Sequence, residues 1–175
     1  MTRVIGIGLM LCVAACSKQA TQAQEALKEI REPAESKLPA AEIAQLGSKG
    51  FAQFQCAAYA SFSDTDKAKA EALFTKGRDS LTRFVETAKT VKDKAKDKAV
   101  ADKVPMIVMQ NLGGPSTDFM LGRIWSATML YAEDELYHRS DWTHQLRDPK
   151  AAPPPKYLVE ADAAQRFRDH NCELL

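Results

Sequence analysis

Residues 40–62 read AAEIAQLGSKGFAQFQCAAYASF, and their apolar residues recur at steps of three and four. That spacing places one apolar side chain after another on the same face of a helix. We therefore predict an amphipathic helix over 40–62, with Cys56 beside its apolar face. Small residues, including Gly47 and Gly50, occupy part of that face.

A second helix is predicted to follow directly. Residues 63–66, Ser-Asp-Thr-Asp, are all of the type that begins helices, so they end the first helix and can start the next. The three- and four-residue spacing of apolar residues then continues, with Gly77 among them, and predicts a long helix over about 65–92 or beyond.

The next segment combines a short apolar run, a loop and a very apolar helix. The run 104–109 fits either a short helix or a strand. Residues 111–116, Asn-Leu-Gly-Gly-Pro-Ser, form the clearest loop, and Ser116 is placed to cap the helix that follows. Residues 119–132 contain a single charge, Arg123, with apolar residues on every side, so we expect the central and most buried helix here, stopping near Ser140.

Prolines interrupt 141–155, and a last helix is predicted over about 157–170, with Asn171 as its C-terminal cap. No alternating strand pattern is visible. The sequence thus predicts an all-α protein: a single helical bundle of four to five helices over 39–175, preceded by a tether over 16–38.

Composition fits a globular chain and excludes several classes. Of its 175 residues, 45% are hydrophobic and 27% are charged, which is unlike a disordered or polytopic membrane protein. The formal net charge is +1, so bulk electrostatics give no reason to expect a nucleic-acid partner.

The first fifteen residues have the pattern of an export signal. Arg3 is followed by an apolar run over 4–15 without an acidic residue. The run is shorter than the roughly 20 residues that a membrane-spanning helix needs. We therefore predict a cleaved signal peptide over 1–15.

Val13-Ala14-Ala15-Cys16 resembles the lipobox of bacterial lipoprotein precursors. The resemblance implies that Cys16 becomes the lipidated first residue of the mature chain, and that the lipid (palmitate and its companion acyl chains) binds the protein to the membrane. Ser17, rather than Asp, follows the cysteine, which in this class favours the outer membrane facing the periplasm. The alternative is an ordinary secretory signal cut after Ala15, leaving Cys16 a plain thiol.

Cysteine usage predicts one disulfide. Cys12 leaves with the signal and Cys16 carries the lipid, so Cys56 and Cys172 remain in an oxidising compartment, where two such cysteines usually pair. The bond would connect the C-terminus to the first core helix.

Residues 89–103 alternate Lys, Asp and Ala, with six Lys and three Asp. Such a segment fits a solvated helix extension or linker. The other interpretation is a docking surface for anionic lipid or glycan.

The candidate binding residues are Asn111, Gly113, Gly114, Ser116 and Arg123. Surrounded by apolar neighbours, the guanidinium must find an acceptor or reach water. We weigh an internal ion pair with Asp118, Asp79 or Glu86 against an anion pocket next to the 111–116 loop, where helix amides after Ser116 would contribute.

Other motifs give weak signals. Glu135-x-x-His138 has the spacing of a di-iron motif, but its only companion, Asp141-x-x-His144, lies in the same segment, so we predict no metal site. Ser116 in Gly-Pro-Ser-Thr-Asp is better explained as a helix cap than as a nucleophile. We assign no catalytic residues and no cofactor.

Two functions remain open on the sequence. The first is a membrane-anchored binding module for an envelope protein, from which a purely structural role cannot be separated. The second is a small-anion-binding protein or enzyme that uses Arg123 and the 111–116 loop. The absence of a recognisable catalytic constellation favours the first.

Overall fold

A computed structural model describes residues 37–138 and 152–175, which all belong to one compact unit running from Ser36 to Leu175. The predicted signal peptide, Cys16, most of the tether, and Asp141 with His144 lie outside these residues. The described part is all-α and contains no strand, as predicted.

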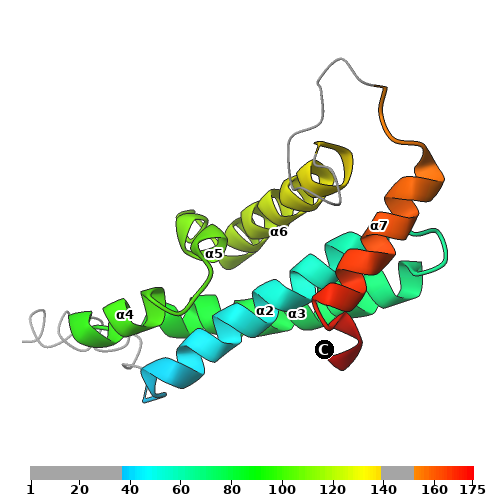
Figure 1. Ribbon diagram of the computed structural model, residues 1–175. Coiled ribbons are helices and arrows are strands. Elements are labelled where there is room, and N and C mark those ends of the chain that lie inside the picture. Colours follow the sequence, from blue (N-terminus) through cyan, green and yellow to red (C-terminus); the bar gives the residue numbers. More distant parts are fainter. Residues whose placement is uncertain (1–36, 139–151) are drawn as a thin grey trace, which may run out of the picture. The chain divides into compact units, whose positions relative to one another are not determined.

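The core is built on two long helices, α2 (Ala40–Ser61) and α3 (Lys67–Ala88), which lie side by side (Figure 1). Two glycines allow their close approach. A Cβ atom added at Gly77 would lie 3.0 Å from the Gly50 carbonyl oxygen and 2.6 Å from a ring carbon of Phe54. The sequence predicted this pair of helices, although α3 ends four residues earlier than expected.

Residues beyond α3 form separate short helices instead of a continued α3. Helix α4 (Lys94–Ala101) has its own N-cap, because the Asp93 carboxylate accepts a hydrogen bond from the Ala95 amide at 2.8 Å. The apolar run forms α5 (Met106–Gln110), so of the two predicted alternatives the helix is correct.

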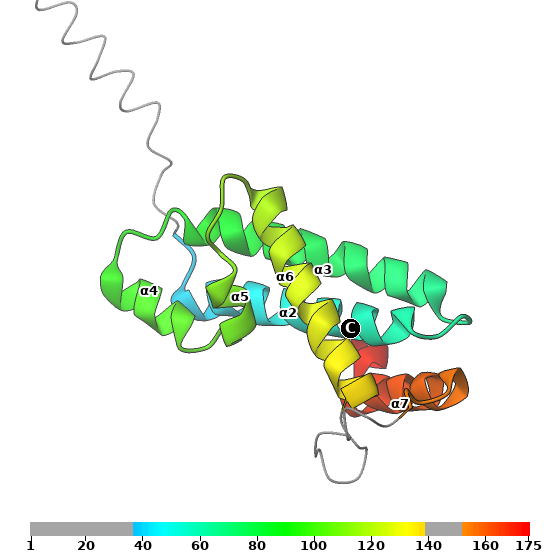
Figure 2. The ribbon, with the colours of Figure 1, turned by 90° about the horizontal axis from the view of Figure 1, so that it is seen from above.

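Helix α6 (Thr117–Glu133) crosses α2 and α3 (Figure 2). It begins as predicted, with the Ser116 hydroxyl accepting a hydrogen bond from the Phe119 amide at 3.2 Å. The expectation that it is the most buried helix is wrong. Only one face is buried, and Phe119, Leu130 and Tyr131 are exposed, whereas α2 has the larger set of buried residues.

After α6 comes a π-helical turn, η1 (Asp134–His138), and the chain is next described from residue 152. Helix α7 (Lys156–Asp169) packs against the C-terminal half of α2, and the short 3₁₀ helix η2 (Cys172–Leu174) ends the chain. Asn171, in the left-handed conformation with φ 53°, separates the two, as the sequence predicted.

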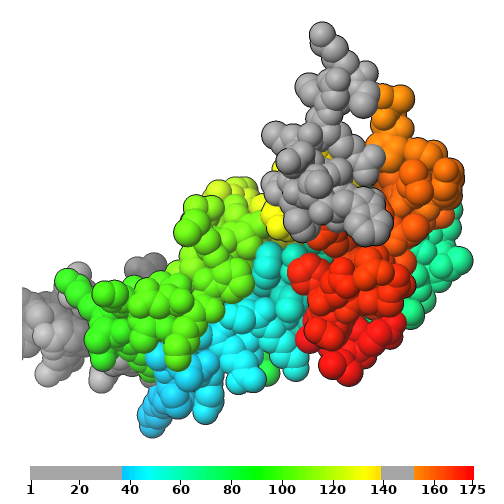
Figure 3. All heavy atoms as spheres, in the orientation of Figure 1, coloured from blue at the N-terminus to red at the C-terminus, as the bar shows by residue number. Residues whose placement is uncertain are grey.

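Two apolar clusters hold the helices together. One joins α2, α3, α4, α5 and α6 around Phe84 and Ile124. The other joins α2, α3, α6, η1, α7 and η2 around Tyr59 and Leu136, and contains the Cys56–Cys172 disulfide, with 5.6 Å between the two Cα atoms. The predicted disulfide is thus present, and the space-filling view shows the C-terminal segments against α2 (Figure 3).

Candidate functional site

Glu135, in η1, is one of the few polar side chains buried in the described core. Its two carboxylate oxygens each accept a hydrogen bond from a tyrosine. The Tyr59 hydroxyl of α2 donates to Oε2 at 2.5 Å, and the Tyr131 hydroxyl of α6 donates to Oε1 at 3.1 Å. A buried carboxylate requires such donors, because leaving it unpaired costs several kcal/mol, on the order of 3 to 5.

The π-helical turn explains how an acidic run reaches the core. Ile124, Thr128 and Ala132 follow one another at four-residue steps along the buried face of α6. In η1 that face continues with Glu135 and Leu136, both buried. π-helical turns are rare and often occur at functional sites, which makes Glu135 the strongest candidate in this part of the chain.

A cation and an imidazole complete the cluster. Arg166 of α7 has its Nη1 atom 3.9 Å from Glu135 Oε1, and its side chain is mostly covered. The His170 ring stacks on Tyr59, with 5.4 Å between centroids and 15° between planes. Tyr59, Glu135, Arg166 and His170 therefore connect α2, η1 and α7.

The chemistry of the cluster is that of a structural network. Burial, and then the hydrogen bond to Glu135, raise the pKa of Tyr59 well above its usual range, so the phenol stays neutral and donates its proton. Since both carboxylate oxygens of Glu135 are already engaged, the group is not placed as a free general base.

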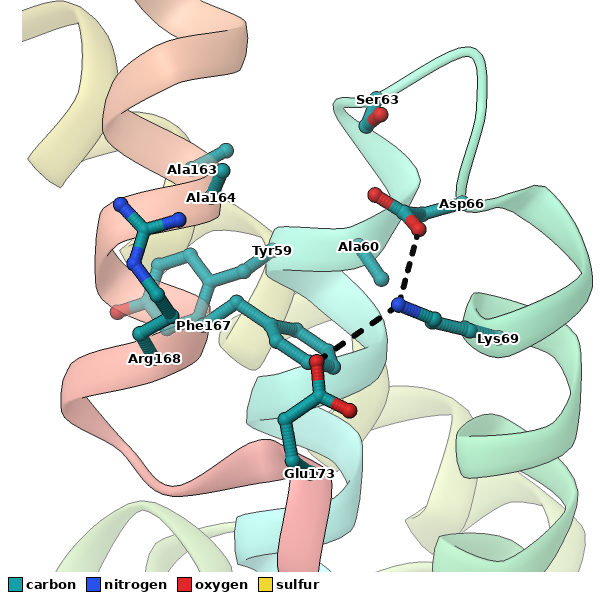
Figure 4. A pocket seen from close by; sticks show the side chains of 10 residues that line it. All are labelled: Tyr59, Ala60, Ser63, Asp66, Lys69, Ala163, Ala164, Phe167, Arg168 and Glu173. Atoms are coloured by element: carbon teal, nitrogen blue, oxygen red, sulfur yellow. Dashed lines mark ion pairs between the residues drawn. The ribbon is translucent and has the colours of Figure 1, made fainter.

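A hollow of about 160 Å³ lies beside this cluster, between α2, α3 and α7. Figure 4 shows Lys69 and Arg168 on opposite sides of the Phe167 ring. Lys69 pairs with Asp66 at 3.3 Å and with Glu173 at 3.7 Å, and the bond to Asp66 is the main cause of its raised pKa. Two cationic side chains and two carboxylates line the hollow. Its charge therefore favours neither an anionic nor a cationic ligand.

Arg123 differs from the sequence prediction. The sequence predicted that its side chain is surrounded by apolar residues, but Arg123 is exposed on α6. It forms no ion pair with any residue in the described part of the chain. Its Nη1 donates to the Gly113 carbonyl oxygen at 2.9 Å. Asp118, one of the partners considered for it, instead faces Arg78 at 3.9 Å. Both interpretations of Arg123 from the sequence are therefore wrong: it neither forms an internal ion pair in the described part of the chain nor lies at the floor of a pocket.

The structure does bring the 111–116 loop and Arg123 together. The polar groups of the loop, however, already form hydrogen bonds with neighbouring parts of the protein. The Asn111 amide donates to the Ile107 carbonyl oxygen at 2.7 Å, and Ser116 caps α6. The Phe119 ring covers Gly114 so closely that an added Cβ atom would lie 2.3 Å from it.

The Glu135-x-x-His138 motif does not converge on one point. Glu135 is buried, whereas His138, three residues later and less than one π-helical turn away, is exposed. Among the described residues, no group of three or more His, Cys, Asp or Glu side chains is arranged to hold a metal ion.

Sequence reasoning missed three members of the cluster, Tyr59, Arg166 and His170. The first two could have been noticed in the sequence. Tyr59 carries a hydroxyl group within the most apolar part of α2. Arg166 lies in the sequence between Ala163 and Phe167, two residues on the buried face of α7. What could not be seen is that both meet Glu135, since these residues lie far apart in the sequence.

Comparison with protein-family models, with curated proteins and with solved structures gave no match to this chain. None of the helices in the described ranges is long and apolar enough to cross a bilayer.

Proposed function

We propose that this protein is a bacterial lipoprotein, anchored through Cys16 on the periplasmic side of the outer membrane, whose helical domain acts as a binding module. The observation that carries the proposal is Val13-Ala14-Ala15-Cys16 at the end of an apolar run. Lipidation there would give stable anchoring, because two or more acyl chains hold a protein on a membrane where one does not.

The disulfide supports export. Cys56 and Cys172 are bonded to each other, and such bonds persist in oxidising compartments such as the periplasm, whereas cytosolic thiols are kept reduced. A bond of this kind fits a chain that leaves the cytosol with its signal peptide.

A binding role is favoured over an enzyme by what the domain exposes. Phe119, Leu130 and Tyr131 on α6, and Met106 on α5, are exposed apolar side chains. Contiguous exposed apolar patches are typical of surfaces that meet other proteins, and these side chains are the candidates for such a patch. The anion-binding alternative has less support, because two of its donors already form hydrogen bonds within the protein. Arg123 donates to the Gly113 carbonyl oxygen, and Asn111 donates to the Ile107 carbonyl oxygen.

Anchoring is tested by fractionating cells that express wild type, Cys16→Ser or Cys12→Ser. Wild type and Cys12→Ser should be in the outer-membrane fraction, because Cys12 is removed with the signal. Cys16→Ser should lack the lipid, and mass spectrometry of the mature N-terminus should show acylation only when Cys16 is present. Wild-type protein found fully soluble in the periplasm would instead indicate ordinary secretory cleavage.

The binding role is tested separately, by crosslinking in intact envelopes. A photoreactive residue at Leu130 should capture one defined envelope protein, and the same residue at Lys76, an exposed position on α3, should not. The capture should be lost when Phe119 is changed to Ser. Equal labelling from both positions would argue against a binding surface on α6.

A further inference from the structure

The positive charge of this nearly neutral chain is concentrated in residues 89–103. Six Lys against three Asp give this segment a net charge of 6 − 3 = +3, compared with +1 for the whole chain. We call residues 89–103 the basic segment. It consists of α4 and the turns on either side of it.

Three of the six lysines in the basic segment contribute no ion pair to the described fold. Helix α4 buries only Val100, and Lys94, Lys98 and Lys103 are exposed and form no ion pair with any described residue. Lys94 even occupies the first position of α4, where the helix dipole disfavours a cation.

Lysines at the other end of α2 and α3 behave differently. Near the turn between those helices, Lys67 pairs with Asp64 at 3.5 Å and Lys69 pairs with Asp66. Lys156 of α7 pairs with Asp64 as well, and it lies 3.6 Å from Glu160. The lysine charges at this end are thus neutralised locally, whereas the three lysines named at the α4 end have no ion-pair partner among the described residues.

The basic segment lies where the chain from Cys16 enters the domain. Leu38, just before α2, packs against the cluster that contains Val100 and Val104. The Ser48 hydroxyl of α2 donates to the Lys103 carbonyl oxygen at 3.0 Å. Figures 1 and 3 show α4 beside the start of α2.

We propose that the basic segment docks the domain on anionic phospholipid headgroups, with Lys94, Lys98 and Lys103 as its main contacts. The inference rests on the proposed lipid anchor, which would hold this end of the domain near a membrane. Lysines close to an anionic bilayer are attracted within about one Debye length, roughly 8 Å at physiological salt. The lipid then supplies attachment, and the lysines set which end of the domain faces the bilayer.

The test uses mature Cys16→Ser protein, so that no acyl chain contributes to binding. Its sedimentation with vesicles of phosphatidylcholine and phosphatidylglycerol (7:3) is compared with its sedimentation with phosphatidylcholine alone. We expect binding only to the anionic vesicles, and its loss in 0.5 M salt, because the attraction is electrostatic.

Two triple variants locate the surface. Lys94→Gln/Lys98→Gln/Lys103→Gln should weaken binding by about fivefold for each lysine removed. The matched control, Lys67→Gln/Lys69→Gln/Lys156→Gln, removes the same charge from the paired end and should bind like the parent. Circular dichroism checks that both variants are folded.

Two results would overturn the docking proposal: no binding of the parent protein to anionic vesicles, or an equal loss in the two triple variants, which would indicate a response to net charge alone. Because this assay uses unlipidated protein, its failure is distinct from a failure of the lipid anchor, which is read from the N-terminal mass of the wild type.

Discussion

Gly77 of α3 lies directly against the backbone of Gly50 of α2, so closely that no larger side chain fits between the two helices. An added Cβ atom at Gly77 would lie 3.0 Å from the Gly50 carbonyl oxygen. The two longest helices of the domain therefore meet backbone to backbone, and the surrounding side chains, such as Phe54 and Leu81, close the core around this contact.

Substituting Gly77 with Ala should push α2 and α3 apart and lower the free energy of unfolding by about 1 to 3 kcal/mol. Gly122 in α6 is the matched control, because an added Cβ atom there meets nothing within 4 Å. Gly122→Ala should raise stability by up to about 1 kcal/mol through helix propensity. Urea denaturation of both variants measures the difference, and changes of the same sign would contradict the close contact.

Loss of the Cys56–Cys172 bond should destabilise the domain strongly. The bond closes a sequence separation of 116 residues, which in the chain-entropy model corresponds to about 4 to 5 kcal/mol. Chemical denaturation of oxidised and reduced protein measures this loss, and Cys56→Ala/Cys172→Ala should match the reduced form. Thiol labelling of denatured, unreduced mature protein should find neither cysteine reactive; full labelling of both would exclude the bond.

Tyr59→Phe should lower the free energy of unfolding by about 1.5 to 3 kcal/mol at pH 8, because buried Glu135 loses a hydrogen-bond donor. Tyr157→Phe, at an exposed tyrosine, should have little effect. Urea denaturation of the three proteins at pH 8 measures these changes.

The same tyrosine predicts a pH dependence. The folded-state pKa of Tyr59 is raised above the unfolded value of 10.0, so the unfolded chain loses this proton first. The stabilisation is complete below pH 10, and falls as the pH rises above it. Wild type should therefore lose stability more steeply above pH 10 than Tyr59→Phe. Parallel curves for the two proteins would show that Tyr59 titrates normally.

Arg123→Met should change the free energy of unfolding by less than about 1 kcal/mol, since Arg123 is exposed and gives up one hydrogen bond to Gly113. Arg166→Met should cost more, up to about 3 kcal/mol, because it removes the cation nearest to buried Glu135. Thermal melts of the two variants compare them directly. A larger loss for Arg123→Met would restore a buried role for that residue.

Local patterns in the sequence were enough to predict the four longer helices, but not the separate short helices α4 and α5. The apolar spacing over 40–62, the capping hydroxyl of Ser116 and the left-handed Asn171 each act within a few residues of the chain, so their effects were predictable one segment at a time. The pairing of Cys56 with Cys172 was predictable for another reason: in an exported chain, these were the cysteines left to pair.

Tertiary packing alone decided which apolar residues are buried and which polar groups meet. Helix α6 is apolar on every side, yet neighbours cover only one of its faces, so Phe119 and Leu130 stay exposed and Arg123 is outside the core. Burial of Glu135 is compensated in part by a hydrogen bond from Tyr59, which is distant in the sequence. Helical periodicity places a side chain on a face, but burial depends on how many other elements surround that face, which no local pattern contains.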